Sequence, residues 1–424
     1  MDIPGTRNKS AALRTGAGKL PFALRTFRSL RVRQFRFFIA SSLAQTACMN
    51  MQQVTTGWFA YKLTGSTALL GVTMLASAIP QLALSVLGGT LADRISKKLI
   101  LSVGLIASAL VALWIGLSTS LHIITWHYLV VSSFLQGSVM ALMMPSRQSL
   151  ISELVGRDNL MNAVALNSSV MNVNQIGAPA IAGFMIAGAG IEGVYYLMVA
   201  LYLVAAAFIY PLRLSPGGAS SGNGRNAILR DIKDGISYVR QNETVLVLLL
   251  LTFLTVLFSM PFRALLPVFT EDILKVGPEK LGILMSASGI GALAGSLVIA
   301  SLGEKGRGML FLHGGILTGL AILAFSFSSS YTLSLVIMVV TGLGQAGRMA
   351  LGNTLLQTYT EDAYLGRVMS LFMMQWGLVG LGTFGVSIAA EFVGVQLAVG
   401  ATALLLVLST LYFYLFSPRV RRLE

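Results

Sequence analysis

The chain is poor in the residues that build most catalytic and metal sites. Its 424 residues include one cysteine, three histidines and 16 Asp and Glu residues. The single cysteine, Cys48, cannot form an intramolecular disulfide, and no cluster of cysteine and histidine has the spacing of a metal site. The sequence also contains no phosphate-binding loop and no nucleophile paired with a base. These absences argue against an enzyme, and we expect no cofactor and no metal.

Charge is scarce as well, and apolar residues take its place. Only 11% of the residues are charged, whereas 55% are hydrophobic, and the mean hydropathy is +0.77. A soluble protein of this size would have too little polar surface to cover itself. Long apolar runs recur instead, and a helix needs about 20 apolar residues to cross the hydrocarbon core. Because a backbone in lipid must satisfy its own hydrogen bonds, the sequence predicts an all-α membrane protein.

We predict twelve transmembrane helices in two six-helix halves. The spans are expected near residues 37–61, 68–92, 99–118, 126–146, 160–187, 193–212, 244–266, 281–302, 309–328, 331–352, 367–390 and 394–416.

Three further segments complete the predicted organisation. A basic N-terminal tail, 1–36, precedes the first half, 37–212, and a short tail, 417–424, follows the second half, 244–416. The linker 213–243 begins with SPGGASSGNG, a flexible composition. Apolar residues at helical spacing follow it, which predicts an amphipathic helix on the cytoplasmic face.

The distribution of positive charge predicts the orientation. Of the 30 Lys and Arg residues, 25 lie in the two tails and in alternate loops, and only Lys62, Lys275 and Lys280 lie in the opposite loops. Cytoplasmic loops carry an excess of Lys and Arg. We therefore expect both termini in the cytoplasm of a bacterium, the chain in its inner membrane, and no nucleic-acid partner.

The two halves resemble each other weakly. The stretch LGVTMLASAIPQLALSVLGGTLADRI can be laid on LGILMSASGIGALAGSLVIASLGEKG with an offset of 211 residues. A second pair, SLISELVGRDNLMNAVAL and TLLQTYTEDAYLGRVMSL, matches with an offset of 205. Two related six-helix halves about an axis normal to the membrane are typical of major facilitator transporters.

A charged loop between the second and third spans makes this resemblance specific. GGTLADRISKKLIL, from residue 88, resembles the major facilitator signature Gly-x-Leu-x-Asp-Arg-x-x-(Arg/Lys)-(Arg/Lys). The matching residues are Gly89, Leu91, Asp93, Arg94, Lys97 and Lys98. The resemblance implies that Asp93 braces the second helix against the eleventh when the transporter is open outward, with Gly366 and Arg367 as neighbours. The alternative is that these charges only set the topology.

The finer resemblance is to a bacterial efflux branch. QQVTTGWFAYKLTGSTALLG, MPSRQSLISELVGRDNLMNAVALNSSVMN and LGRVMSL are similar to enterobactin exporters and macrolide efflux proteins. This implies export of a medium-sized amphipathic metabolite, siderophore or drug by alternating access, driven by protons, in a monomer within the bilayer. A facilitator or importer of a small metabolite, a lysolipid flippase and a non-transporting sensor remain alternatives.

Two features bear on the coupling to protons. GAPAIAG, with Gly177, Pro179 and Gly183, resembles a loose form of the fifth-helix antiporter signature, or else a Pro/Gly kink that only packs. The fourth-helix arginine of drug–proton antiporters is replaced by Ser133, and no acid lies near the middle of a predicted span. Proton-coupled pumps commonly carry buried carboxylates or histidines.

Polar residues at midspan depth are the candidates for the substrate cavity. Amides are unusual in lipid and should face an interior, where they bind substrate or join helices. Methionine beside them suits an adaptable amphipathic ligand. Arg263 could instead snorkel to the interface, and Arg348 could meet an anionic substrate or Glu361. The candidates are Gln45, Met49, Gln52, Gln53, Gln136, Met140, Asn167, Asn174, Gln175, Arg263, Gln345, Arg348 and Gln375.

Overall fold

The computed structural model describes residues 28–212, 225–302 and 306–423. Of residues 28, 85–94, 157–158 and 225–232 it describes the backbone but not the side chains. Every regular element in this part of the chain is helical. The all-α fold class is therefore confirmed.

The first half contains four long helices. After the short η1 (Arg28–Arg31), these are α2 (Arg33–Thr64), α3 (Thr67–Arg94), α4 (Lys97–Ser120) and α5 (Trp126–Ile209). Helix α5 is three passes in one, because Gly156 and Gly190 adopt φ values of 67° and 77° and reverse the chain direction. A side chain at such a φ is strained, so glycine is the residue that permits both breaks.

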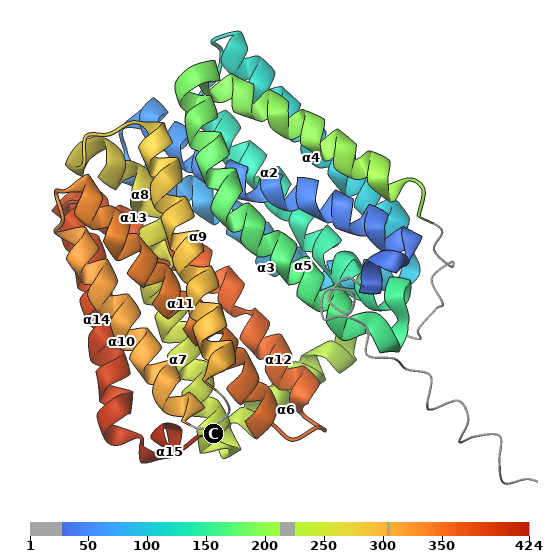
Figure 1. The fold of residues 1–424 in the computed structure, drawn as a ribbon, viewed down its shortest axis with the longest axis vertical. Helices are drawn as coiled ribbons and strands as arrows, with labels where there is room; N and C mark the ends of the chain where they lie inside the picture. Colours follow the sequence, from blue (N-terminus) through green and yellow to red (C-terminus); the bar gives the residue numbers. More distant parts are fainter. Residues whose placement is uncertain (1–27, 213–224, 303–305, 424) are drawn as a thin grey trace, which may run out of the picture.

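The second half is built from shorter pieces. The passes are α7 (Glu243–Ser259) with α8 (Pro261–Val268) and η2 (Phe269–Ile273), α9 (Pro278–Ser301), α10 (Arg307–Ser326), α11 (Tyr331–Tyr359), α12 (Leu365–Met373) with α13 (Gln375–Val393), and α14 (Val395–Phe416). Helices α6 (Arg225–Gln241) and α15 (Pro418–Arg421) flank them at one end of the molecule (Figure 1).

The described helices make twelve passes. Ten stretches are long and apolar enough to cross a membrane, and one of these, 159–209, contains two passes separated at Gly190. Helix α2 supplies the remaining pass; it is 32 residues long but carries more polar residues than the others. We number the passes 1 to 12 along the chain. The prediction of twelve transmembrane helices is confirmed.

The two halves repeat the same helix crossings, as the sequence offsets predict. In the first half Gly137 of pass 4 packs directly on the carbonyl group of Ser77 in pass 2. In the second half Gly342 of pass 10 packs on the carbonyl group of Ser288 in pass 8. The residues differ by the offsets of 205 and 211, so the pseudo-symmetry extends to single contacts. Small residues at such crossings let two helix backbones approach closely.

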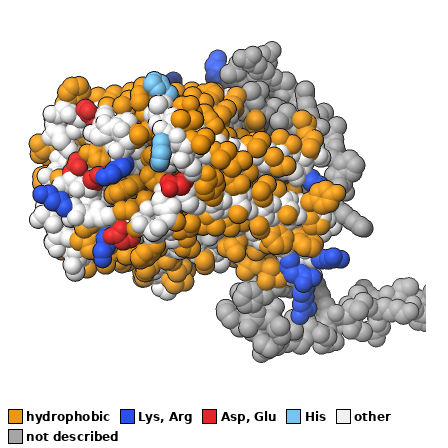
Figure 2. All heavy atoms as spheres, turned by 90° about the horizontal axis from the view of Figure 1, so that it is seen from above, with side chains coloured by type: hydrophobic (Ala, Val, Ile, Leu, Met, Phe, Trp, Pro, Cys, Tyr) orange, Lys and Arg blue, Asp and Glu red, His pale blue; other side chains and the backbone are white. Residues whose placement is uncertain are grey.

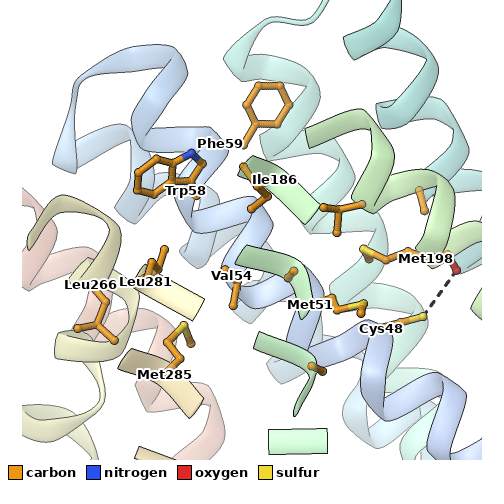
Figure 3. Packing of buried hydrophobic residues seen from close by; sticks show 14 of the residues in the cluster. Cys48, Met51, Val54, Trp58, Phe59, Ile186, Met198, Leu266, Leu281 and Met285 are labelled. Atoms are coloured by element: carbon orange, nitrogen blue, oxygen red, sulfur yellow. Dashed lines mark hydrogen bonds between the residues drawn. The ribbon is translucent and has the colours of Figure 1, made fainter. Parts of the chain in front are cut away.

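The halves also share an apolar core. Val54 and Trp58 of α2 belong to the same buried cluster as Leu266, Leu281 and Met285 of the second half. Figure 3 shows these side chains facing one another between α2, α8 and α9. A second buried cluster lies within the second half alone, around α6, α7, α12 and α15. The first cluster therefore joins the two halves, whereas the second cluster stabilises the second half by itself.

Candidate functional site

The two halves meet at one end of the molecule and diverge toward the other (Figure 1). Two helix pairs make the junction. In passes 2 and 11, Gly71 packs on Ser387; in passes 5 and 8, Gly282 packs on Pro179. Along the same helix faces, the side chains nearer the other end are exposed, at Met161, Ala165, Ser168, Leu293, Ala300, Ser370 and Met373. We call the joined end the closed end and the other, where α6 and α15 lie, the open end.

A carboxylate bridges the halves at the closed end. Glu391, in the last turn of α13, accepts hydrogen bonds on Oε2 from the amide of Ala68 at 3.0 Å, Thr67 Oγ1 at 2.8 Å and Ser66 Oγ at 3.1 Å. These three donors form the N-terminal turn of α3, where backbone N–H groups lack helical partners and the helix dipole is positive. Glu391 therefore caps a helix of the other half.

Two further polar contacts join the halves beside it. Tyr61 donates a hydrogen bond to Asp272 Oδ2 at 2.5 Å, and Lys62 forms an ion pair with Glu271 at 2.8 Å. Figure 2 shows acidic and basic side chains gathered among apolar ones at the left of the view. The ion pair of Lys62 with Glu271 therefore joins the halves at the closed end.

The signature loop lies at the open end, and the structure describes only part of it. Gly89, Leu91, Asp93 and Arg94 lie in the last turns of α3, but their side chains fall outside the description. Lys97 forms an ion pair with Glu153 at 2.8 Å, and Lys98 lies over the ring of Tyr210 at 5.1 Å. Both contacts fix the loop within the first half.

The expected partners of Asp93 lie at the start of pass 11. Gly366 is exposed, with no atom near the position of an added Cβ. Arg367 lies 3.9 Å from Asp234 of α6 and stacks over Tyr364 at 5.5 Å. Arg367 thus contacts the linker helix and its own half, and the brace with Asp93 stays a prediction.

The fifth-helix motif lies at the crossing of passes 5 and 8. Pro179 and Gly183 are buried there against Gly282 and the start of α9, whereas no atom lies near an added Cβ at Gly177. A side chain larger than hydrogen at Gly183 or Gly282 would meet backbone atoms of the opposite half. Two members of the motif therefore join the halves at the closed end.

Several of the predicted cavity amides join helices of the first half in this conformation. Arg147 of pass 4 is buried and donates hydrogen bonds to Gln45 Oε1 and Ser42 Oγ of α2. Ser42 in turn donates to Asn167 Oδ1 at 2.9 Å. Asn174 donates to the carbonyl of Leu43 at 2.9 Å and to the hydroxyl of Thr46. Passes 1, 4 and 5 are thus tied together by satisfied polar groups.

A second polar group lies deeper in the first half. Gln136 donates to Tyr202 Oη at 3.0 Å and to Ser108 Oγ at 3.2 Å. These residues and Gln52 line a cavity of about 10 Å³. That volume holds about one water molecule and no larger ligand.

The remaining candidates are scattered. Gln53 is exposed, Met49 and Gln175 are half-buried, and Met140 is buried. In the second half Arg263 is half-buried, whereas Gln345, Arg348 and Gln375 are buried. Arg348 and Glu361 form no ion pair in the described part of the chain, and Glu361 is exposed.

Sequence reasoning missed the residues that close the molecule. Glu391 lies one residue beyond the predicted end of its span, and Tyr61 lies at the last residue of another. The only signal for Glu391 was an isolated acid beside a span. Among the described residues no group of three or more metal-binding side chains is found.

Comparisons with known proteins agree on a family. The model of the family described as "Transmembrane secretion effector" matches residues 24–423. The chain is 24% identical to the staphyloferrin A transporter of Staphylococcus aureus, over 91% of this chain and 97% of that protein. It is 27% identical to the enterobactin exporter EntS of Shigella boydii, over 74% of each chain.

A solved structure shows the same fold. A bacterial homolog of the human lysosomal transporter Spinster, in an inward-facing and unoccupied conformation, aligns with a TM-score of 0.69 at 15% identity. The alignment covers 95% of this chain and 98% of that one.

Proposed function

The chain belongs to the transmembrane secretion effector family of the major facilitator superfamily, and on that premise we propose that it exports a medium-sized amphipathic organic molecule across the bacterial inner membrane. The observation that carries the proposal is the match of the family model to nearly the whole chain. Its relatives include a staphyloferrin A transporter and an enterobactin exporter. The protein is a membrane transporter and not an enzyme.

The charge distribution supports a cytoplasmic position for the open end. The linker helix α6, the C-terminal helix α15 and the loop with Lys97 and Lys98 lie at that end, and together they carry eight Lys and Arg residues. Since cytoplasmic loops carry the excess of Lys and Arg, the conformation is open to the cytoplasm and closed toward the outside. A transporter in this state loads its substrate from the cell interior.

The surfaces between the halves support an amphipathic substrate. Exposed or half-buried methionines, Met49, Met161 and Met171, lie on α2 and α5 together with the amides of Gln53 and Gln175. Methionine adapts its shape to irregular apolar ligands. Amides add hydrogen-bonding groups without fixing a charge, which suits a substrate with apolar and polar parts.

We also propose that the proton gradient drives export, through the carboxylates at the closed end rather than within the spans. Glu271, Asp272 and Glu391 join the halves there and are among the few described acids in contact with the opposite half. An acid in such a position links its own charge to the separation of the halves. The chain is expected to act as a monomer.

Transport into everted membrane vesicles tests the proposal. Vesicles that contain the protein should accumulate enterobactin or staphyloferrin A when energised, and a protonophore should abolish the accumulation. Vesicles without the protein are the control. Absence of uptake for both siderophores and for a macrolide, together with scrambling of labelled lysolipid, would replace the exporter by the flippase alternative.

A further inference from the structure

Buried polar side chains without partners gather in the second half. Ser259, Arg348 and Gln375 have no hydrogen-bond partner for their side-chain polar atoms among the described residues. Gln345 contacts only the sulfur of Met260, at 3.7 Å. All four side chains are more than nine-tenths buried. Unsatisfied buried groups are rare in folded proteins, and each calls for an explanation.

Arg348 is the most demanding member of this group. Its side chain is 1% exposed, and Nε, Nη1 and Nη2 all lack a partner. Arginine remains protonated in proteins. An isolated charge in a low-dielectric interior is strongly unfavourable, and ionisable groups within membrane spans usually mark a ligand or ion path. The guanidinium therefore needs an anionic partner at some stage of the transport cycle.

The first half shows that the architecture does not require this arginine. Met143 of pass 4 and Arg348 of pass 10 differ by the offset of 205, and each lies against a glycine of the preceding pass, Gly104 and Gly314. Arginine thus replaces a methionine at the equivalent position. The other buried arginine, Arg147, has hydrogen-bond acceptors on α2. Arg147 is satisfied in this conformation, and all three guanidinium nitrogens of Arg348 are not.

The hydrogen-bond ladders of passes 7 and 11 are locally altered beside the same group, while both passes stay helical. In pass 7, Met260 follows Ser259 and precedes Pro261, which has no N–H to donate. In pass 11, Met374 precedes Gln375, and the bonds there tighten to the Leu371 and Gly377 neighbours three residues away. Passes 7 and 11 are in contact, because Gly382 packs on Leu257 of α7. Ser259 and Gln375 therefore lie on two passes that pack against each other.

We infer that Ser259, Gln345, Arg348 and Gln375 form the site that binds a carboxylate group of the substrate. This inference rests on the proposed function and adds that the exported molecule is an organic anion. The guanidinium presents paired N–H donors that match the two oxygens of a carboxylate. The amides and the hydroxyl supply further donors from passes 7, 10 and 11.

Thermal unfolding of the purified full-length protein in detergent tests this site. Citrate serves as the polycarboxylate probe, triethyl citrate as its neutral analogue, and chloride at equal ionic strength as the inorganic anion. We expect citrate alone to raise the Tm of the parent protein. The variant Arg348→Met introduces the residue found at the equivalent position of the first half. It should lose this increase in Tm, and its apparent Kd for citrate should be at least tenfold larger. Arg348→Lys should retain part of the effect.

The matched control is Arg147→Met. Without ligand, Arg348→Met should have an equal or higher Tm than the parent, since it removes an uncompensated buried charge. Arg147→Met should have a lower Tm, since it leaves the acceptors on α2 unpaired, but it should keep its response to citrate. This difference separates a ligand site from a structural role.

The other outcomes are decisive as well. Equal citrate protection of the parent and Arg348→Met, or no protection of either, overturns the inference. Protection by chloride that depends on Arg348 shows an inorganic anion site and overturns the assignment to substrate. Normal siderophore export by Arg348→Met refutes the inference while leaving the exporter intact. If Arg348→Met loses the citrate protection but the parent protein exports neither siderophore, the proposed export is refuted and the anion site stands.

Discussion

Neutralising Glu391 should release the closed end without unfolding the protein. Glu391→Gln keeps the size of the side chain and one acceptor oxygen, but it removes the charge that faces the N-terminus of α3. A charge at a helix N-terminus contributes about 0.3–1 kcal/mol when exposed, and Glu391 is exposed. A loss of about 1 kcal/mol raises the ratio of outward-open to inward-open protein about fivefold. The remaining junctions, such as Gly71 with Ser387, stay in place.

Labelling of a cysteine placed behind this contact measures the change. Ser387 is fully buried beneath Thr67 and Gly71, so Ser387→Cys, in a Cys48→Ala background, becomes accessible only when the closed end opens. A membrane-impermeant thiol reagent added to intact cells should label it about five times faster in the Glu391→Gln protein.

The matched control is Glu279→Gln, an acid at the same end whose carboxylate lies beside Gly277 of its own half. It should leave the labelling rate unchanged. An unchanged rate in Glu391→Gln, or an equal increase in the control, would refute the reasoning.

Three further predictions concern topology, packing and the signature loop. Single cysteines at Ser220 and Ser329 should differ on intact cells: an impermeant reagent should label position 329 only, and labelling at 220 would contradict cytoplasmic termini. Arg147→Met should lower the free energy of unfolding by about 1–3 kcal/mol, because it leaves buried acceptors unpaired; chemical denaturation of the purified protein measures this. Asp93→Asn should keep normal membrane levels but slow export, and unchanged export would reduce the loop to a topology signal.

The fold could be predicted because the membrane limits the choices. Apolar runs of sufficient length can only be helices in lipid. The central linker and the internal repeat divide them into two halves, and the charge asymmetry predicts their orientation. The breaks at Gly156 and Gly190 were visible as loops in the hydropathy pattern. The altered hydrogen bonding at Met260 and Met374 was not, because both residues lie within predicted spans and keep helical dihedral angles.

The site was less accessible to sequence reasoning. Their depth along the helices showed that Gln136 and Asn174 face the inside of the protein. It did not show whether they face a substrate cavity or a neighbouring helix of the same half. Their partners, Tyr202 and Thr46, lie on other helices of the same half, and that arrangement depends on how the helices rotate against each other. Whether these amides also contact substrate stays a prediction. The sequence also could not predict which end of the molecule is open, because one sequence must support both the open and the closed arrangement of each end.

The most direct test of the account is a reversible lock on the closed end. Ser66 and Glu391 face each other across the halves, with Ser66 Oγ 3.1 Å from the carboxylate. The pair Ser66→Cys and Glu391→Cys, in a Cys48→Ala background, can be oxidised to a disulfide in everted vesicles. Alternating access predicts that oxidation stops the uptake of exported siderophore and that a reductant restores it. Continued uptake with the disulfide fully formed would contradict the claim that substrate leaves through this end.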